Sequence, residues 1–429
     1  MNMRLAVCIK TVGCRTNQAD SLQIMRKLEP LDVRLVKNFE DADIIIINTC
    51  AVTSRAERDV RLYLGQARRR SPRALIAVAG CMTGITPPSA WAKFGHVEIF
   101  SNAGKNDIPG WVEKIARRDP PPGREKSETS GPRRVLRPPV KVQEGCAMSC
   151  SYCIVPRTRG PERSTSVEVI VEKIRWFVER GAKEIVLTGT QLGSWGKDLD
   201  PPLAVADLLD TLLEKDAGAR IRLSSIEPWG VDEKLVKVFS GRPGRLCPHL
   251  HIPLQSGCDA VLRNMNRPYT APQYAEIIEA LLKADPDISL GTDLIVGFPG
   301  EGEAQLEETL GFVRGLPLAY LHVFSYSRRE GTPAAGMKGG AAQREIRERV
   351  AAFKKLDDAK RKAYMEKYIG RKVQAVIEKL SADDELSGTA AQFFKVVIPD
   401  AGDSAGLVGE IVDVRPLRVE SNKAVSKIV

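Results

Sequence analysis

The stretch that decides the fold is KVQEGCAMSCSYCIVP, residues 141–156. It starts as a short strand and continues into a loop with Cys146, Cys150 and Cys153, spaced C-x3-C-x2-C. Three thiolates at this spacing can hold one corner of an iron–sulfur cubane and leave the fourth iron free to bind a small molecule. Structural zinc is the alternative, but it prefers four ligands, and no fourth Cys or His lies near this run. The spacing therefore favours an iron–sulfur cluster with an open iron.

Strand-like apolar runs and helical stretches alternate from this loop onward. The expected strands are 141–144, 184–189, 220–226, 249–254, 288–297 and 320–326. Six such strands, most of them followed by a helix, predict a partial (β/α)6 barrel, an open relative of the (β/α)8 barrel. The active site of such a barrel lies at the C-terminal ends of its strands. A long charged helix over about 341–368 follows the last strand.

The N-terminal part of the chain shows a second alternating pattern. Apolar runs at 4–9, 42–48, 74–80 and 96–100 are separated by helical stretches at 17–28, 54–70 and 107–117. Near-continuous apolar strands with helices between them predict a parallel sheet that is covered on both faces. The N-terminal domain is therefore predicted to be α/β.

Three further cysteines each follow one of these strands, Cys14 in VGC, Cys50 in NTC and Cys81 in AGC. Loops that follow parallel strands open at one edge of the sheet, so the three thiols could converge on a second cluster. Three separately buried core cysteines are the alternative, because Cys is often buried. Cys8, Cys247 and Cys258 are expected to be ordinary buried thiols.

Two composition changes divide the chain. Residues 119–139 are rich in Pro, Gly, Ser and charge, which is typical of a linker. After residue 369, apolar and polar residues alternate between turns, which predicts a small C-terminal β-barrel. The predicted division is an N-terminal domain at 1–118, the linker at 119–139, a core with its trailing helix at 140–368, and the β-barrel at 369–429.

The overall composition excludes several classes of protein. The 429 residues are 43% hydrophobic and 28% charged, and no apolar run approaches the roughly 20 residues that a membrane-spanning helix needs. Nine cysteines without an export signal favour metal or catalytic thiols over disulfides. We therefore expect a cytoplasmic protein with no membrane partner. We also expect it to be a monomer, although neither composition nor motifs determine the oligomeric state. The net charge of +10 favours a nucleic-acid partner, although solubility alone could account for it.

Five segments together resemble one family, the radical S-adenosylmethionine methylthiotransferases. They are GCRTNQADS (13–21), NTCAVTSRAERDVR (48–61), EGCAMSCSYCIVPRTRGPERS (144–164), HIPLQSGCD (251–259) and GTDLIVGFPGE (291–301). The resemblance covers essentially the whole chain and implies an auxiliary-cluster domain, a radical S-adenosylmethionine core and a TRAM-like RNA-binding barrel. It implies that Cys146, Cys150 and Cys153 hold a 4Fe-4S cluster whose open iron binds S-adenosylmethionine. It also implies that Cys14, Cys50 and Cys81 hold an auxiliary 4Fe-4S cluster.

The resemblance also implies a reaction and its partners. A tRNA adenosine beside the anticodon would gain a methylthio group at C2, with two S-adenosylmethionine molecules and a reducing electron donor. The segments 17–21 and 48–61 are most similar to the bacterial branch that acts on N6-threonylcarbamoyladenosine. Two other branches stay open, one acting on isopentenyladenosine in tRNA and one on an aspartate of a ribosomal protein. A non-catalytic iron–sulfur RNA-binding protein is an alternative of a different class.

Candidate S-adenosylmethionine contacts follow from the same resemblance or, for Glu227 and Gln255, from a polar side chain at the end of a predicted barrel strand. Besides Tyr152 in the cysteine loop, they lie at or near the ends of predicted strands: Thr190, Gln191, Glu227, Gln255, Ile295 and Gly297. A glycine-rich turn could equally explain the first two of these, and packing in a strand could explain Ile295.

The arginines and histidines near these motifs have different expected roles. Arg159 and Arg163 could hold substrate anions or face solvent. His249, His251 and His322 lie in apolar strands and are expected to be structural.

Overall fold

The computed structural model describes residues 5–31, 33–118, 135–215, 218–241, 244–400, 402 and 404–429. The chain forms two compact units. The first comprises Met1–Arg133, Glu144–Glu162 and Ser327–Ala335, and the second comprises Arg134–Gln143, Arg163–Tyr326 and Gly336–Val429. The predicted linker lies outside the described residues from 119 to 134. The predicted domain boundaries stay a prediction.

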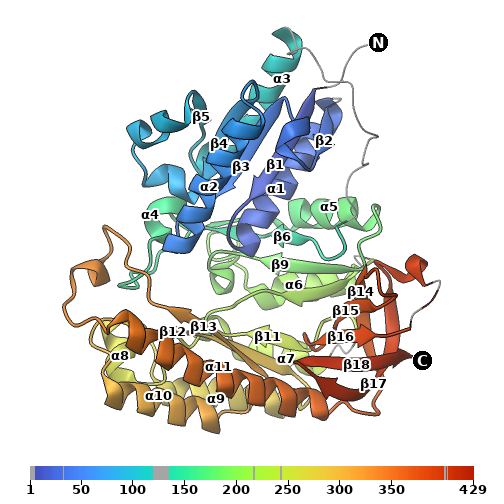
Figure 1. Ribbon diagram of the computed structural model, residues 1–429. Helices are drawn as coiled ribbons and strands as arrows, with labels where there is room; N and C mark the ends of the chain where they lie inside the picture. Colours follow the sequence, from blue (N-terminus) through green and yellow to red (C-terminus); the bar gives the residue numbers. More distant parts are fainter. Residues whose placement is uncertain are drawn as a thin grey trace. The chain divides into compact units, whose positions relative to one another are not determined.

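The first unit is built on a parallel five-stranded sheet of order β2-β1-β3-β4-β5 (Figure 1). Near-continuous apolar sequence explains its buried strands, since all six residues of β3 are buried. The strands are β1 (Ala6–Thr11), β2 (Arg34–Val36), β3 (Ile44–Thr49), β4 (Leu75–Gly80) and β5 (Val97–Ile99).

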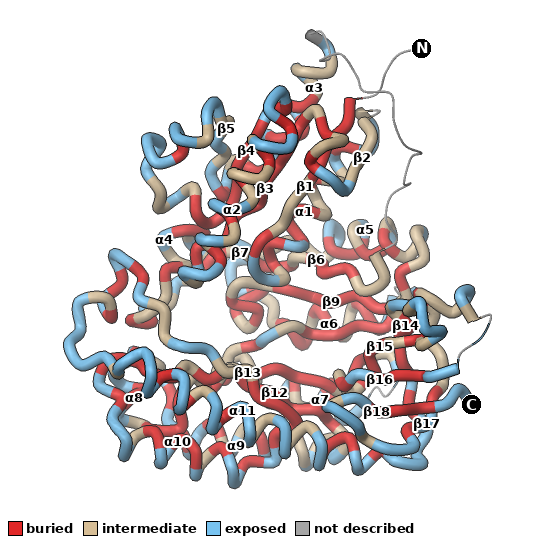
Figure 2. The backbone as a smooth tube through the Cα atoms, viewed as in Figure 1, coloured by how far each residue is buried: buried red, intermediate tan, exposed pale blue. Residues whose placement is uncertain are grey.

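Helices cover both faces of this sheet. Ile44 and Ile46 pack on one side with residues of α1 (Arg15–Leu28) and α3 (Ile108–Arg118). Ile45 and Ile47 pack on the other side with residues of α2 (Ser54–Arg70). Alternate side chains of β3 therefore pack into two separate hydrophobic cores. Figure 2 shows that the central strands of the sheet are buried. The three-layer α/β prediction is confirmed.

The second unit contains six parallel strands in two linked sheets of orders β10-β9-β6 and β11-β12-β13. Bridges join the sheets at Ile221 with Leu246 and at Ser225 with His251, so the strand succession is that of a partial (β/α)6 barrel. The strands are β6 (Pro139–Lys141), β9 (Glu184–Thr188), β10 (Arg220–Leu223), β11 (His249–His251), β12 (Ser289–Val296) and β13 (Tyr320–Ser325). A short ribbon of β7 (Gln143–Glu144) and β8 (Arg163–Ser164) adjoins them in the chain.

Helices follow the strands as the alternation predicts, and a long helix closes the series. The long helix α11 ends near the predicted position and packs against β13 and β12. The helices are α4 (Val155–Arg159), α5 (Val167–Val178), α6 (Val205–Glu214), α7 (Glu233–Gly241), α8 (Asp259–Asn264), α9 (Ala271–Ala284), α10 (Glu303–Gly315) and α11 (Gln343–Glu366).

The C-terminal segment of the second unit forms a closed barrel of order β14-β15-β16-β18-β17. The strands are β14 (Val373–Leu380), β15 (Leu386–Ala390), β16 (Lys395–Ile398), β17 (Ile411–Glu420) and β18 (Lys423–Ile428). The barrel core continues into that of its neighbours, because Phe394 packs on Tyr368 with ring centroids 5.3 Å apart. The predicted β-barrel is confirmed, and it shares a hydrophobic core with α11 and β13.

In the part of the chain that the structure describes, no helix combines the length and the apolar character needed to cross a membrane.

Candidate functional site

Cys14, Cys50 and Cys81, named here the first cysteine group, lie at one edge of the N-terminal sheet. They directly precede α1, follow β3 and follow β4, and these neighbouring strands all point to that edge. Cys50 and Cys81 are buried and Cys14 is exposed. Burial raises the pKa of the Cys50 thiol to about 11, and the nearby thiols of Cys14 and Cys81 raise it too. The structure thus brings the three predicted thiols within electrostatic range of one another.

Two glycines make this close approach possible. Gly13, with φ of 105°, precedes Cys14, and a Cβ atom added there would lie 2.5 Å from Cβ of Cys50. Gly80, with φ of 102°, precedes Cys81, and its added Cβ would lie 2.5 Å from the carbonyl oxygen of Thr49. Any larger residue would push the cysteine loops apart and would strain the backbone.

Polar side chains fasten the three loops to one another. Asn17 Nδ2 donates to the carbonyl oxygens of Val12 at 2.7 Å and Thr49 at 2.8 Å, which links the Cys14 and Cys50 loops. Thr49 Oγ1 donates to the carbonyl oxygen of Ala79 at 2.7 Å and accepts from the Met82 amide at 3.2 Å, which links the Cys50 and Cys81 loops. All these groups are buried, so each hydrogen bond satisfies a group that would be costly to leave unpaired.

Cys146, Cys150 and Cys153, named the second cysteine group, occupy the loop between β7 and α4 in the same compact unit. The loop is held at both ends, since the Cys146 amide donates to the Gly160 carbonyl at 3.1 Å and the Cys153 amide to the Cys150 carbonyl at 3.1 Å. A Cβ atom on Gly145 would lie 1.8 Å from the carbonyl oxygen of Pro161. Backbone hydrogen bonds and a close approach at Gly145 therefore fix the course of the loop that carries the three thiols.

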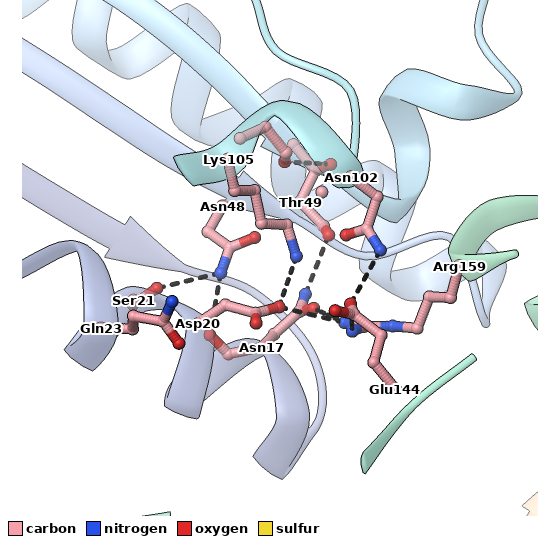
Figure 3. Close-up of polar contacts among 12 residues, drawn as sticks. Asn17, Asp20, Ser21, Gln23, Asn48, Thr49, Asn102, Lys105, Glu144 and Arg159 are labelled. Carbon is pink, nitrogen blue, oxygen red and sulfur yellow. Dashed lines mark hydrogen bonds and ion pairs between the residues drawn. The ribbon is translucent and has the colours of Figure 1, made fainter. Parts of the chain in front are cut away.

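A buried polar network lies beside the first cysteine group (Figure 3). The Arg159 guanidinium donates to Glu144 Oε1 at 2.8 Å, approaches Asp20 Oδ2 at 3.4 Å and donates to Asn17 Oδ1. Lys105 pairs with the same Asp20 carboxylate, and Asn102 Nδ2 donates to Glu144 Oε1 at 3.1 Å. Of the two roles expected for Arg159, facing solvent is wrong, because the side chain is buried in ion pairs with carboxylates of this chain, and holding substrate anions stays a prediction.

A segment far along the chain also joins this unit. Arg329 Nη1 donates to the Ala51 carbonyl at 3.0 Å and to Glu57 Oε1 at 2.9 Å, beside Cys50. The Ala334 amide donates to the Ser151 carbonyl at 2.8 Å, inside the second cysteine loop. Residues 327–335 therefore contact both cysteine loops, a role that no local sequence signal indicates.

The other predicted cofactor residues belong to the second unit and lie at or near strand ends. Thr190 and Gln191 follow β9, and their amides donate to Gln143 Oε1 at 2.9 and 2.8 Å. The Thr190 hydroxyl is buried and has no hydrogen-bond partner among the described residues. Glu227 follows β10 and accepts from the Gly193 amide at 3.0 Å.

The remaining members of this set lie on the β11–β13 side of the unit. Gln255, with φ of 71°, follows β11 and pairs with Leu294 in an isolated bridge. Ile295 lies on β12, and Gly297 directly follows that strand with φ of 79°. Tyr152 lies in the first unit and is half-buried. The structure therefore places six of the seven candidates along the C-terminal side of one set of strands.

The histidines form a hydrogen-bonded chain on one face of the β11-β12-β13 sheet. Tyr320 Oη lies 2.8 Å from His249 Nε2 and 2.9 Å from His251 Nδ1. His251 Nε2 lies 2.8 Å from Asp293 Oδ1, which is 3.4 Å from His322 Nδ1. His251, Asp293 and His322 are close enough to hold a metal ion, but their ligand atoms already contact one another. The buried pair, His249 and His251, fits the structural role expected for it.

Comparisons with known proteins agree with this geometry. The Radical SAM superfamily matches residues 140–313, and the uncharacterized protein family UPF0004 matches residues 6–101. The threonylcarbamoyladenosine tRNA methylthiotransferase MtaB of Aquifex aeolicus is 35% identical, over 87% of this chain and 93% of its own length. The chain belongs to the radical SAM methylthiotransferases. The predicted family and its enzyme class, a transferase, are confirmed.

Other relatives of this methylthiotransferase carry a different name. The tRNA-2-methylthio-N(6)-dimethylallyladenosine synthase of Syntrophobacter fumaroxidans is 36% identical, over 76% of this chain and 75% of its own length. Among solved structures, the radical S-adenosylmethionine methyltransferase TsrM from Kitasatospora setae matches 77% of each chain with a TM-score of 0.58 at 13% identity. That likeness concerns the fold alone.

A radical SAM domain implies S-adenosylmethionine and one 4Fe-4S cluster, and the residues of this methylthiotransferase fit both. The second cysteine group offers three thiols, which suits a cubane with one iron left for a ligand. The unpartnered Thr190 hydroxyl near the end of β9 suits a polar ligand at the barrel mouth.

Proposed function

We propose that this chain is a tRNA methylthiotransferase that inserts a methylthio group at C2 of N6-threonylcarbamoyladenosine next to the anticodon. The observation that carries the proposal is the convergence of Cys14, Cys50 and Cys81 at one sheet edge, in the same compact unit as the second cysteine group. Buried structural thiols would have no need of two glycines at which an added Cβ atom would lie only 2.5 Å from the neighbouring cysteine loop. A reaction with two distinct sulfur-bearing centres requires two separate three-thiol sites.

The two groups would have different tasks. The second group would hold the 4Fe-4S cluster that binds S-adenosylmethionine, and the first group would hold an auxiliary 4Fe-4S cluster. When bound, S-adenosylmethionine and the two clusters would supply the radical, the methyl group and the site of sulfur chemistry. The chain's own residues would orient them: Thr49 and Asn17 hold the loops of the first group in register. Because Cys14 is the exposed member, substrate would approach the first group from its side.

The substrate class is supported by relatives and by charge. The relatives named above act on tRNA according to their names, and the net charge of +10 suits a polyanion. A base to be modified must leave its stack, which is easiest in a single-stranded loop such as the anticodon loop. A reducing electron donor would complete the set of partners.

The choice of modified base rests on the segments 17–21 and 48–61, because relatives of both names are similarly identical to this chain. The test uses reconstituted enzyme with two anticodon stem-loops that differ only in carrying N6-threonylcarbamoyladenosine or isopentenyladenosine. Nucleoside mass spectrometry should detect the methylthio product from the first and little from the second. The reverse preference, or a methylthiolated ribosomal aspartate with tRNA unchanged, would contradict the proposal.

The two-cluster part has its own test. Anaerobically reconstituted chain should bind about eight irons, and Cys146→Ala/Cys150→Ala/Cys153→Ala should leave about four. Cys50→Ala should still form 5′-deoxyadenosine under reductant but no methylthio product. Stoichiometric zinc without charge-transfer absorption would show that the cysteines serve another purpose.

A further inference from the structure

Arg159 connects the two cysteine groups without being a ligand of either. It is the last residue of α4, the short helix directly after the second cysteine group, and only 5% of its surface is exposed. Its partners Asn17 and Asp20 lie on α1, which begins at the first cysteine group, and its partner Glu144 precedes the second group. One guanidinium is therefore hydrogen-bonded to the segments that carry both groups (Figure 3).

Arg159 is paired with carboxylates before any thiolate is considered. Arg159 contacts Asp20 and Glu144, and Lys105 pairs with the same Asp20 carboxylate. Burial acts to lower the pKa of Arg159, but Cys81, Asp20, Cys14 and Glu144 raise it overall. The guanidinium therefore lies within electrostatic range of two thiols of the first group while it is already paired with two carboxylates.

We propose that Arg159 is a positioning residue that fastens the second cysteine loop to α1 and supplies the fixed positive charge facing the first cysteine group. The planar guanidinium suits this task, since its fork of donors reaches several acceptors at once and stays charged at any working pH. The positioning part stands on the contacts of the chain itself. The charge part rests on the proposed function, because it concerns the auxiliary cluster.

A fixed cation has a predictable effect on such a cluster. Reduction adds one negative charge, so a nearby guanidinium stabilises the reduced form more than the oxidised form. Removing the cation should make the midpoint potential of the auxiliary cluster more negative. Removing only the hydrogen-bond fork, while keeping a cation, should loosen the loop and leave the potential nearer to that of the wild type.

Four variants separate these effects. Arg159→Gln removes both the charge and the fork, and Arg159→Lys keeps a charge but loses the planar fork. Arg159→Gln/Glu144→Gln removes a buried ion pair as a pair, which avoids leaving the Glu144 carboxylate buried without its cation. Arg157→Gln is the matched control, because Arg157 belongs to the same helix but is exposed, and its guanidinium donates to the Glu330 carbonyl at 3.3 Å rather than to the partners of Arg159.

The first measurement uses the full-length chain without clusters. Amide hydrogen exchange should become faster, on the order of tenfold, over residues 14–20 and 144–162 in Arg159→Gln and Arg159→Lys. The control Arg157→Gln should exchange like the wild type in both segments. Exchange in Arg159→Gln that matches the control would overturn the positioning role.

The second measurement is a potentiometric titration monitored by electron paramagnetic resonance. It is made in the Cys146→Ala/Cys150→Ala/Cys153→Ala background, where the auxiliary cluster titrates alone. Arg159→Gln should shift the midpoint potential to a more negative value, and Arg159→Lys should shift it less. Arg159→Gln/Glu144→Gln removes one charge of each sign and should also shift it less than Arg159→Gln. An unchanged potential in Arg159→Gln would overturn the charge role. A background chain that binds no iron would instead defeat the two-cluster proposal, and the exchange experiment would still decide the positioning role.

Discussion

Two buried charge networks can be compared, one in each compact unit. In the second unit, Glu184 accepts from Arg137 at 2.8 Å, Arg220 at 2.7 Å and Arg222 at 2.7 Å. Glu184 and Arg220 are the first residues of β9 and β10, so the network is centred on strand starts, although Arg222 is the third residue of β10. Arg222 also donates to the carbonyl oxygens of Ala390 and Ala391 in the C-terminal barrel. In the first unit, by contrast, the Arg159 network lies beside cysteines that follow strand ends.

The two networks differ in what they face. The Glu184 network contacts the C-terminal barrel, because Arg222 joins β9 and β10 to the carbonyl oxygens of that barrel. The Arg159 network faces thiols that a metal cluster would occupy. In parallel α/β folds, strand starts serve stability and strand ends serve chemistry. Burial of charged groups alone therefore does not indicate a functional site. A position beside the strand ends does.

The largest effect is expected for Glu184→Gln, which tests whether the Glu184 network serves stability. The change leaves three buried arginines without their shared carboxylate, which should lower the free energy of unfolding by about 3–5 kcal/mol. Glu378→Gln is the matched control and should cost less, because the Glu378 side chain is 26% exposed and pairs with Arg137 alone among these arginines. Denaturant titration of the cluster-free chain measures both. Normal stability combined with lost iron in Glu184→Gln would mean that this network, too, serves the clusters.

Acid should weaken the same network. Burial alone would raise the pKa of Glu184, but Arg222, Arg137 and Arg220 lower it well below its usual value. A lowered folded-state pKa gives stability that is present above the unfolded-state pKa of about 4.3 and is lost as the pH falls toward the folded value. The unfolding free energy of the cluster-free wild type should therefore fall more steeply below that pH than that of Glu184→Gln. Parallel curves would show that Glu184 does not carry the acid sensitivity.

The sequence predicts the elements that local pattern determines. Helix α2 begins and ends where expected, at Ser54 and Arg70, and the Thr53 side chain caps it by accepting from the Ala56 amide at 3.2 Å. The run Ile44–Ile47 predicts a strand buried on both faces, and all four residues are buried. Strand β2, of three residues, is missed, whereas the equally short β5 lies in the expected run 96–100.

The candidate site is predicted only as far as topology determines it. The first cysteine group could be placed because loops after parallel strands open at one edge. The burial of Arg159 could not be predicted, because Asn17 and Asp20 lie 142 and 139 residues away in the chain. The contact of Arg329 with the Cys50 loop spans 278 residues and has no local signal. Long-range ion pairs are invisible to periodicity and spacing.

Thr49→Val tests the hydrogen bonds that join the loops of the first cysteine group. The change keeps the shape but leaves the Ala79 carbonyl and the Met82 amide without their hydroxyl partner, which should cost about 1–3 kcal/mol. These bonds join the Cys50 and Cys81 loops. A chelator should therefore remove iron from the first cysteine group faster in Thr49→Val than in the wild type. Thr49→Ser keeps the hydroxyl and is the control. Equal iron retention in Thr49→Val would confine Thr49 to a role in the fold.

The smallest expected effect concerns the outer surface of the C-terminal barrel. Arg415 on β17 and Lys427 on β18 are exposed and directly opposite each other in the antiparallel register. Like charges in that position repel, so they suit a site where an anion lies between them. Lys372 belongs to the same barrel, but its ammonium lies 2.6 Å from Asp413 and its charge is already paired.

Under the proposed function, Arg415→Gln/Lys427→Gln should weaken tRNA binding severalfold. The slope of log affinity against log salt should become shallower by about 1.4–1.8, since each lost phosphate contact contributes about 0.7–0.9. Lys372→Gln should leave the slope unchanged. Deleting the chain beyond Gly370 would be a poorer test, because it would expose the core that Phe394 and Tyr368 form and remove the acceptors of Arg222. If the double variant binds tRNA with the wild-type slope, this face does not contact phosphate, and the barrel would contribute to the fold in the manner of the Glu184 network rather than to the substrate.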